Sequence, residues 1–268
     1  MKTTFTYLLV LLLTDYLCSI LAYVKHNGGV SRSSLTPLFA RGIADLKNLW
    51  LQNSEGNAEN IESRYSVLRK MFLISGPLGM SLDNYHGLFG VLEYESIGRP
   101  IQVVLNDTIL LKSAVWVPAL FAFAGLGMSA IIITLDVVNG NKKHGLPSWP
   151  TTLYSISLFS FQYYLSGLLD FLNVDLSTTH LMLMLLAISG YSAFDKSLSG
   201  LQLSIMTAIA GPVVEIFLIN YGHLYSYTNA DTLGICSWIP WVYFLGGTAV
   251  GNLARRLYHD ENKDIMKI

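Results

Sequence analysis

Long stretches without a charged residue dominate the second half of this chain and restrict what it can fold into. Residues 115–135, 149–169, 176–194 and 232–254 contain no Asp, Glu, Lys or Arg. Each stretch approaches the roughly 20 apolar residues that an α-helix needs to cross a bilayer. The whole chain is 13% charged, whereas a soluble domain carries about 25% charged residues. The sequence therefore predicts a polytopic membrane protein.

Two further segments are predicted to span the membrane although each contains an acidic residue. Residues 71–92 include Asp83, and residues 197–219 include Glu215. An acid in a span costs roughly 3 kcal/mol on insertion scales and is tolerated where it faces the interior of a bundle. The predicted fold class is therefore all-α, a six-helix transmembrane bundle over residues 69–258.

Charge and cysteine content exclude several classes of protein. The formal net charge is −1, so no basic surface for nucleic acid is expected. Cys18 and Cys236 are the two cysteines, too few for a disulfide framework. Asp83 and His86 lie three residues apart on one helical face, but no second such pair completes a metal site. Neither enzymatic activity nor a cofactor or metal is predicted.

The two ends of the chain differ from the bundle in composition. Residues 1–22 have the pattern of a signal peptide, and residues 23–45 resemble a basic, serine-bearing transit segment. Residues 46–68 form a polar segment that predicts a poorly ordered linker, and residues 259–268 form a polar tail.

Basic residues near the span ends predict the orientation of the bundle. Positive charges favour the side from which insertion occurs. One side carries Arg64, Arg69, Lys70, Lys142, Lys143, Lys196, Arg255, Arg256, Lys263 and Lys267. The other side holds Arg99 and Lys112. Asp195 and both ends of the bundle fall on the positive side.

This orientation conflicts with a cleaved secretory signal, which would place the basic loops on the wrong side. Two hypotheses stay open: a plastid membrane protein with a bipartite presequence, and an endoplasmic reticulum protein whose N-terminus is not translocated. The motif Asn106-Asp107-Thr108 lies opposite the basic loops and is a glycosylation site only in the secretory case.

Polar residues within the predicted spans are the candidates for ligand contacts. Gln162 in the third span needs a hydrogen-bond partner, either on a neighbouring helix or on a ligand with one polar end. Gly211-Pro212 in the fifth span predicts a kink or local unwinding beside Glu215. That acid should be protonated or hydrogen-bonded, in a cavity or in a polar clamp between helices. Gly247 and Gly251 in the sixth span form a GxxxG pair, which on its own is a weak packing signal.

Several ordered blocks resemble one known family. "WVP" at 116–118 is followed by Asp136, and "AFDKSLSG" occupies 193–200. "YSYT" begins at residue 225, "SWIP" at 237 and "FLGGTAVGNLARRL" at 244. Their order and spacing are similar to those of the insulin-induced gene (INSIG) family of six-span sterol regulators.

The resemblance implies a function and a set of site residues. Members of the family hold oxysterol within the bundle and retain sterol-sensing-domain proteins in the endoplasmic reticulum membrane. The aspartate that binds these partners corresponds to Asp195. The family's pocket residues correspond to Thr178, Tyr191 and Glu215, none of them identical, so an altered lipid ligand is plausible.

The prediction is therefore a non-enzymatic INSIG-like membrane regulator that binds a sterol or related lipid and retains or scaffolds membrane proteins. The expected partner-binding residue is Asp195, and the expected ligand-binding residues are Thr178, Tyr191, Gln162 and Glu215. Two alternatives stay open: a small lipid or proton-coupled transporter, and a structural subunit of a plastid membrane complex.

Overall fold

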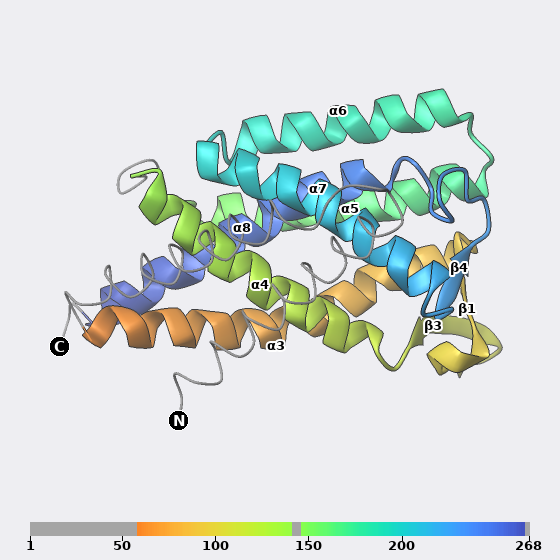
Figure 1. The fold of residues 1–268 in the computed structure, drawn as a ribbon, viewed down its shortest axis with the longest axis horizontal. Coiled ribbons are helices and arrows are strands. Elements are labelled where there is room, and N and C mark those ends of the chain that lie inside the picture. Colours follow the sequence, from red (N-terminus) through yellow and green to blue (C-terminus); the bar gives the residue numbers. More distant parts are fainter. Residues whose placement is uncertain (1–57, 141–145, 266–268) are drawn as a thin grey trace, which may run out of the picture. The chain divides into compact units, whose positions relative to one another are not determined.

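The computed structural model describes residues 58–140 and 146–265. The predicted signal peptide and transit segment, and Lys142 and Lys143, lie outside the described residues. Residues 62–268 make up one compact unit, and the following concerns the described part of that unit. Its long helices, shown in Figure 1, are α3 (Ala58–Phe89), α4 (Val117–Val138), α5 (Trp149–Phe171), α6 (Leu176–Phe194), α7 (Leu198–Asn220) and α8 (Ile239–Ile265).

These helices confirm the predicted helical bundle. The predicted spans 115–135, 149–169, 176–194 and 197–219 each match one helix to within three residues at either end. In the described part of the chain, α4, α6 and α7 are long and apolar enough to cross a membrane. α5 carries many hydroxyl groups and an amide, and the last third of α8 is charged. These two helices are therefore less apolar than α4, α6 and α7.

Both outer boundaries of the bundle differ from the prediction. Residues 58–68, predicted as linker, belong to α3, and residues 259–265, predicted as tail, belong to α8. Val67 and Leu257 pack in the same hydrophobic cluster, and Lys70 forms an ion pair with Glu261. The two polar segments are therefore continuations of α3 and α8, which this cluster and this ion pair connect.

Four short strands, which the sequence did not predict, accompany the helices. β1 (Leu92–Tyr94) follows α3 in the chain, and β4 (Tyr225–Tyr227) follows α7. These two strands pair antiparallel. After a 3₁₀ turn at Ser96–Gly98, β2 (Pro100–Leu105) and β3 (Thr108–Ala114) form a hairpin. We call this end of the bundle the hairpin end, and the opposite end, toward which α8 runs, the basic end (Figure 1). Arg255 lies in the C-terminal half of α8.

Local sequence signals fix where the helices begin. Ser148 Oγ accepts a hydrogen bond from Thr151 N at 3.2 Å, and Ser197 Oγ accepts one from Gly200 N at 3.0 Å. Asp175 Oδ2 accepts the Thr178 N–H at 2.8 Å. Each cap satisfies an N–H group that has no partner inside its helix. α7 continues through Pro212, so the predicted local unwinding does not occur there.

α8 is the central helix, because it packs against α4, α5, α6 and α7. Its small residues permit this close packing. A Cβ atom on Gly247 would lie 2.6 Å from Ser204 Cα on α7, which is backbone and cannot move aside. A Cβ atom on Gly251 would lie 3.2 Å from Leu203 Cδ2, the end of a flexible side chain. The GxxxG pair therefore marks the contact between α7 and α8.

This difference between the glycines predicts unequal effects of the same substitution. We expect Gly247→Ala to lower the free energy of unfolding by roughly 1–3 kcal/mol, the usual cost of overpacking. Gly251→Ala should cost less, because Leu203 can change its rotamer. Urea titration in detergent micelles, followed by tryptophan fluorescence, measures both variants. Equal losses in the free energy of unfolding would show that the rigid α7 backbone does not limit how closely α7 and α8 approach each other.

Candidate functional site

The basic end is organised around the guanidinium of Arg255. Arg255 Nε and Nη2 donate to the two carboxylate oxygens of Asp136 at 2.6 and 2.8 Å. Arg255 Nη1 donates to Asp195 Oδ2 at 2.9 Å, and Nη2 also donates to Ser197 Oγ at 2.9 Å. We call Asp136, Asp195, Ser197 and Arg255 the arginine cluster. It joins the ends of α4 and α6 and the start of α7 to α8.

Asp195 lies inside this cluster and not on the surface. Its side chain is 2% exposed, and its second oxygen, Oδ1, accepts the Ser197 N–H at 3.1 Å and the Ser197 hydroxyl. A Cβ atom on Gly200 would lie 1.7 Å from Asp195 Oδ2, so glycine leaves the space that the carboxylate fills. The direct interactions of Asp195 are therefore within its own chain, and its predicted partner-binding role stays a prediction.

Glu215 forms a second buried cluster with two tyrosines. Tyr227 OH donates to Glu215 Oε2 at 2.7 Å, and Tyr243 OH donates to Oε1 at 2.6 Å. Both carboxylate oxygens therefore have partners, as predicted for a buried acid. Since Glu215 lies on α7, Tyr227 on β4 and Tyr243 on α8, the arrangement is that of a polar clamp between elements. We call these three residues the glutamate clamp.

Asp83 and His86 bond to different partners although they share one face of α3. Tyr94 OH, on β1, donates to Asp83. His86 Nε2 lies 2.8 Å from Ser166 Oγ on α5, and its ring stacks on Tyr163 with the ring centroids 4.4 Å apart. Within the described residues, no group of His, Cys, Asp and Glu is arranged to hold a metal ion. The geometry favours a packing role for this pair.

Gln162 is the predicted ligand residue whose hydrogen bonds remain incomplete. Its side chain is fully buried between α5 and α6, and Nε2 donates to the Leu183 carbonyl at 2.8 Å. Gln162 Oε1 has no hydrogen-bond partner among the described residues. A buried acceptor without a donor costs roughly 1–3 kcal/mol. The amide oxygen is therefore available to a hydroxyl group that reaches it.

Thr178 and Tyr191 lie at opposite ends of α6. Thirteen residues separate them, which corresponds to about 20 Å along a helix. Thr178 is exposed, and its N–H and hydroxyl both bond to Asp175, holding the pKa of that carboxyl below its usual range. Tyr191 OH donates to the Ser197 carbonyl at 2.9 Å, and its ring packs edge-on against Phe244. One polar group of a ligand cannot contact both residues.

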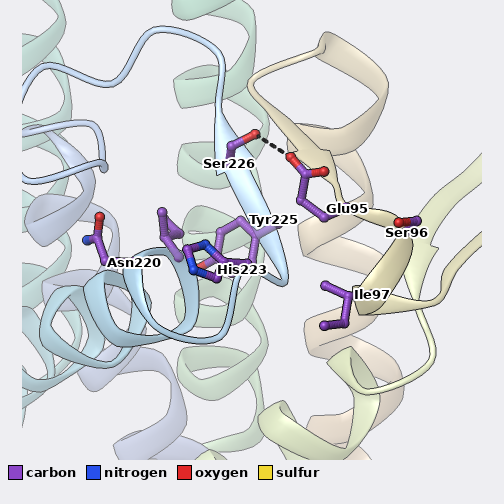
Figure 2. A pocket seen from close by; sticks show the side chains of 8 residues that line it. Glu95, Ser96, Ile97, Asn220, His223, Tyr225 and Ser226 are labelled. Carbon is purple, nitrogen blue, oxygen red and sulfur yellow. Dashed lines mark hydrogen bonds between the residues drawn. The ribbon is translucent and has the colours of Figure 1, made fainter.

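A pocket of about 490 Å³ opens at the hairpin end, and none of the five predicted site residues is among its lining residues. Figure 2 shows Glu95, Ser96 and Ile97 on one side and Asn220, His223, Tyr225 and Ser226 on the other. The Ser226 hydroxyl donates to Glu95 Oε1 across the opening at 3.5 Å. Its walls come from the segments that flank β1 and β4, so the pairing of these strands forms it.

A chain of hydrogen bonds that the sequence did not predict lies at the same end. Trp241 Nε1 donates to His180 Nδ1 at 3.1 Å, so the neutral imidazole carries its proton on Nε2. His180 Nε2 donates to Ser237 Oγ at 2.9 Å, and Ser237 Oγ donates to Asp231 Oδ2 at 2.7 Å. Because the serine donates to the aspartate and not to the histidine, the histidine does not activate it as a nucleophile. The chain ties α6 to the start of α8.

Comparison with known proteins identifies the family. No family model matches the chain. The insulin-induced gene 1 protein of Xenopus laevis is 33% identical over 239 residues, which cover 88% of this chain and 86% of that protein. The chain belongs to the insulin-induced gene (INSIG) family. The human insulin-induced gene 1 protein is 33% identical over 170 residues, 62% of this chain and 60% of that protein.

A solved INSIG structure has the same fold. MvINS, an INSIG homologue from Mycobacterium vanbaalenii, superposes with a TM-score of 0.59 at 16% identity, covering 72% of this chain and 94% of that chain. A cross-linked trimer of MvINS gives the same score and coverage. The INSIG assignment and the apolar helices together establish an integral membrane protein of helical-bundle fold.

Proposed function

We propose that this INSIG protein is a regulator in the endoplasmic reticulum membrane. It binds a hydroxyl-bearing sterol or a related lipid within its bundle and retains membrane proteins that carry sterol-sensing helices. Membership in the INSIG family over 86% of the Xenopus relative is the observation that carries the proposal. No catalytic step is part of it.

The lipid-binding part of the proposal centres on Gln162. Its unpartnered amide oxygen lies in the seam between α5 and α6, and both helices also present large apolar side chains outward. A ligand that enters from the bilayer between these helices would bring a hydroxyl donor to Oε1 and gain the missing hydrogen bond. Its apolar body would extend along α6 toward Tyr191, because about 12 Å of helix separates Leu183 from that residue. Glu215 supports the bundle through its tyrosines.

Photolabelling with a diazirine sterol probe tests this contact. We expect Gln162→Leu to weaken labelling by roughly five- to tenfold, since one hydrogen bond contributes roughly 1–1.5 kcal/mol. A probe that lacks the hydroxyl should label the wild type as weakly as the hydroxylated probe labels Gln162→Leu. The matched control is Gln102→Leu, the same change on the exposed hairpin, which should label normally. Equal labelling of both variants would reject Gln162 as the contact, and indifference to Tyr191→Ala would reject this pocket.

The partner-binding part of the proposal concerns the loop between α6 and α7. Lys196 on this loop and Leu198 at the start of α7 are exposed, whereas the Asp195 carboxylate is buried in the arginine cluster. Asp195 would therefore support a partner contact by holding the loop, and its exposed neighbours would touch the partner. Co-purification of a sterol-sensing-domain protein should fall in Leu198→Asp without a change in stability, and in Asp195→Ala together with a loss of stability. Unchanged co-purification in both would exclude the loop.

A further inference from the structure

We propose that Asn106 is an N-glycosylation site at the tip of the β2–β3 hairpin. The inference rests on the endoplasmic reticulum location in the proposed function, because the modifying enzyme acts there. Asn106-Asp107-Thr108 is the single Asn-x-Ser/Thr motif in the sequence, and its middle residue is not proline. Such a motif is a weak signal on its own, so the argument depends on where the fold places it.

The fold presents Asn106 as an accessible acceptor. Asn106 and Asp107 are the two turn residues between Leu105 and Thr108, with φ values of 48° and 61°. Two central residues with positive φ are the signature of a type I′ hairpin turn, in which Asn is favoured. Asn106, Asp107 and Thr108 are all exposed. A bulky group on Asn106 Nδ2 would displace nothing.

The hairpin presents the motif at its tip, beyond the point where β3 is attached to α3. β2 and β3 pair with each other, and Asn84 on α3 bonds to the Leu110 carbonyl at 3.0 Å and to the Lys112 N–H at 2.7 Å. Six residues of β2 at about 3.3 Å each place Asn106 roughly 20 Å beyond the start of the strand. Aliphatic side chains on both strands are exposed, including Val103, Val104, Leu105, Ile109 and Leu110. A hydrophilic glycan at the tip would add polar bulk beside this apolar surface.

The charges of the bundle place the hairpin on the side opposite its basic loops. Lys70, Arg255 and Arg256 lie at the basic end, joined to Glu261, Asp136, Asp195 and Asp260. Arg99 and Lys112 are the basic residues of the hairpin segment. The positive-inside rule therefore puts the basic end in the cytosol and Asn106 in the lumen.

The reaction is a glycosyl transfer without a change in oxidation state. The donor class is an oligosaccharide joined through pyrophosphate to a polyisoprenoid lipid. A bond forms between Asn106 Nδ2 and the anomeric carbon, while the bond from that carbon to the pyrophosphate oxygen breaks. The amide nitrogen loses one proton to solvent, and the lipid pyrophosphate departs with the bonding electrons.

Gel mobility of the full-length chain, produced in endoplasmic reticulum membranes and treated with peptide N-glycosidase, tests the site. We expect the wild type and Thr108→Ser to migrate faster after treatment, and Asn106→Gln and Thr108→Ala to be unaffected. Because the enzyme leaves aspartate in place of the modified asparagine, mass spectrometry then locates the site. Asp264→Thr creates a second motif at Asn262 on the basic end, which should stay unmodified.

Two results would overturn the inference. One is a wild-type chain that is monodisperse in detergent and does not shift, and the other is modification of Asn262 in Asp264→Thr, which would reverse the orientation. Sterol photolabelling of the same preparations separates this inference from the proposed function. A glycosylated chain that the sterol probe does not label would refute lipid binding alone. An unmodified chain that is labelled in a Gln162-dependent way would refute only the glycosylation of Asn106.

Discussion

Replacing Arg255 with alanine is expected to lower the free energy of unfolding by about 3–5 kcal/mol, the range for removing one partner of a buried ion pair. Arg255 is 9% exposed and bonds to two carboxylates, of which Asp195 is 2% exposed. Without the guanidinium, two negative charges would face each other at the meeting point of α4, α6, α7 and α8. Urea titration in micelles, followed by tryptophan fluorescence, gives the value.

Arg256 is the matched control for this substitution. It is the next residue on α8, and it pairs with Asp260 one turn further along the same helix. A more exposed pair of this kind contributes about 0.3–0.5 kcal/mol. Packing of Arg256 over the Trp149 ring, 5.6 Å from its centroid, adds a contribution of similar size at an exposed site. If Arg256→Ala lowered the free energy of unfolding as much as Arg255→Ala, the arginine cluster would contribute no more to stability than an exposed ion pair.

Replacing Glu215 with alanine is the second change with a large expected effect. It leaves the buried hydroxyls of Tyr227 and Tyr243 without their acceptor. Each unsatisfied hydroxyl costs roughly 1–3 kcal/mol, so the free energy of unfolding should fall by roughly 2–6 kcal/mol. Tyr227→Phe and Tyr243→Phe should each recover part of this loss in the Glu215→Ala background, because they remove the unsatisfied group.

Glu95→Ala is the control for the glutamate clamp. Glu95 is exposed at the rim of the pocket, and the hydrogen bond that its side-chain carboxylate accepts from Ser226 is long, at 3.5 Å. An exposed substitution of this kind should change stability by less than about 0.5 kcal/mol. Two results together would favour the transporter alternative over a structural role for the glutamate clamp. One is a change in the free energy of unfolding in Glu215→Ala that is as small as that in Glu95→Ala. The other is a pH-dependent uptake into vesicles that Glu215→Gln abolishes.

The helices could be predicted from the sequence because hydrophobic length is a local property. The positions of α4, α5 and α6 follow from uncharged runs and from caps such as Ser148 and Asp175, and that of α7 follows from an apolar run with a single acid, Glu215. The β2–β3 hairpin also has a local signal, because aliphatic residues lie on both sides of Asn106-Asp107. Its strands were not predicted, because they are too short to appear as membrane spans. β1 and β4 had no such signal, since their pairing joins residues more than 130 positions apart.

The candidate site was predicted as a set of residue types, not as an arrangement. Charge counting placed Asp195 and Arg255 on one side of the membrane, but it could not show that they pair with each other and with Asp136. Glu215 was predicted to be protonated or hydrogen-bonded, and its two hydrogen bonds agree with the second alternative. Its partners lie on β4 and α8, so they depend on the tertiary fold. Gln162 was selected for being polar within a span, and only the fold shows which of its atoms lacks a partner.

The pairing of β1 with β4 also sets an order for biosynthesis. β1 cannot pair until β4 has been synthesised, and β4 leaves the ribosome only after α4, α5, α6 and α7. The pairs that form last are Leu92 with Tyr227, Glu93 with Ser226 and Tyr94 with Tyr225. Until then the carbonyls of Gly90 and Val91, which bond to Thr228, also lack their partners. A chain truncated before residue 225 would keep this segment open, and quality-control proteases would have a ready substrate at the end of α3.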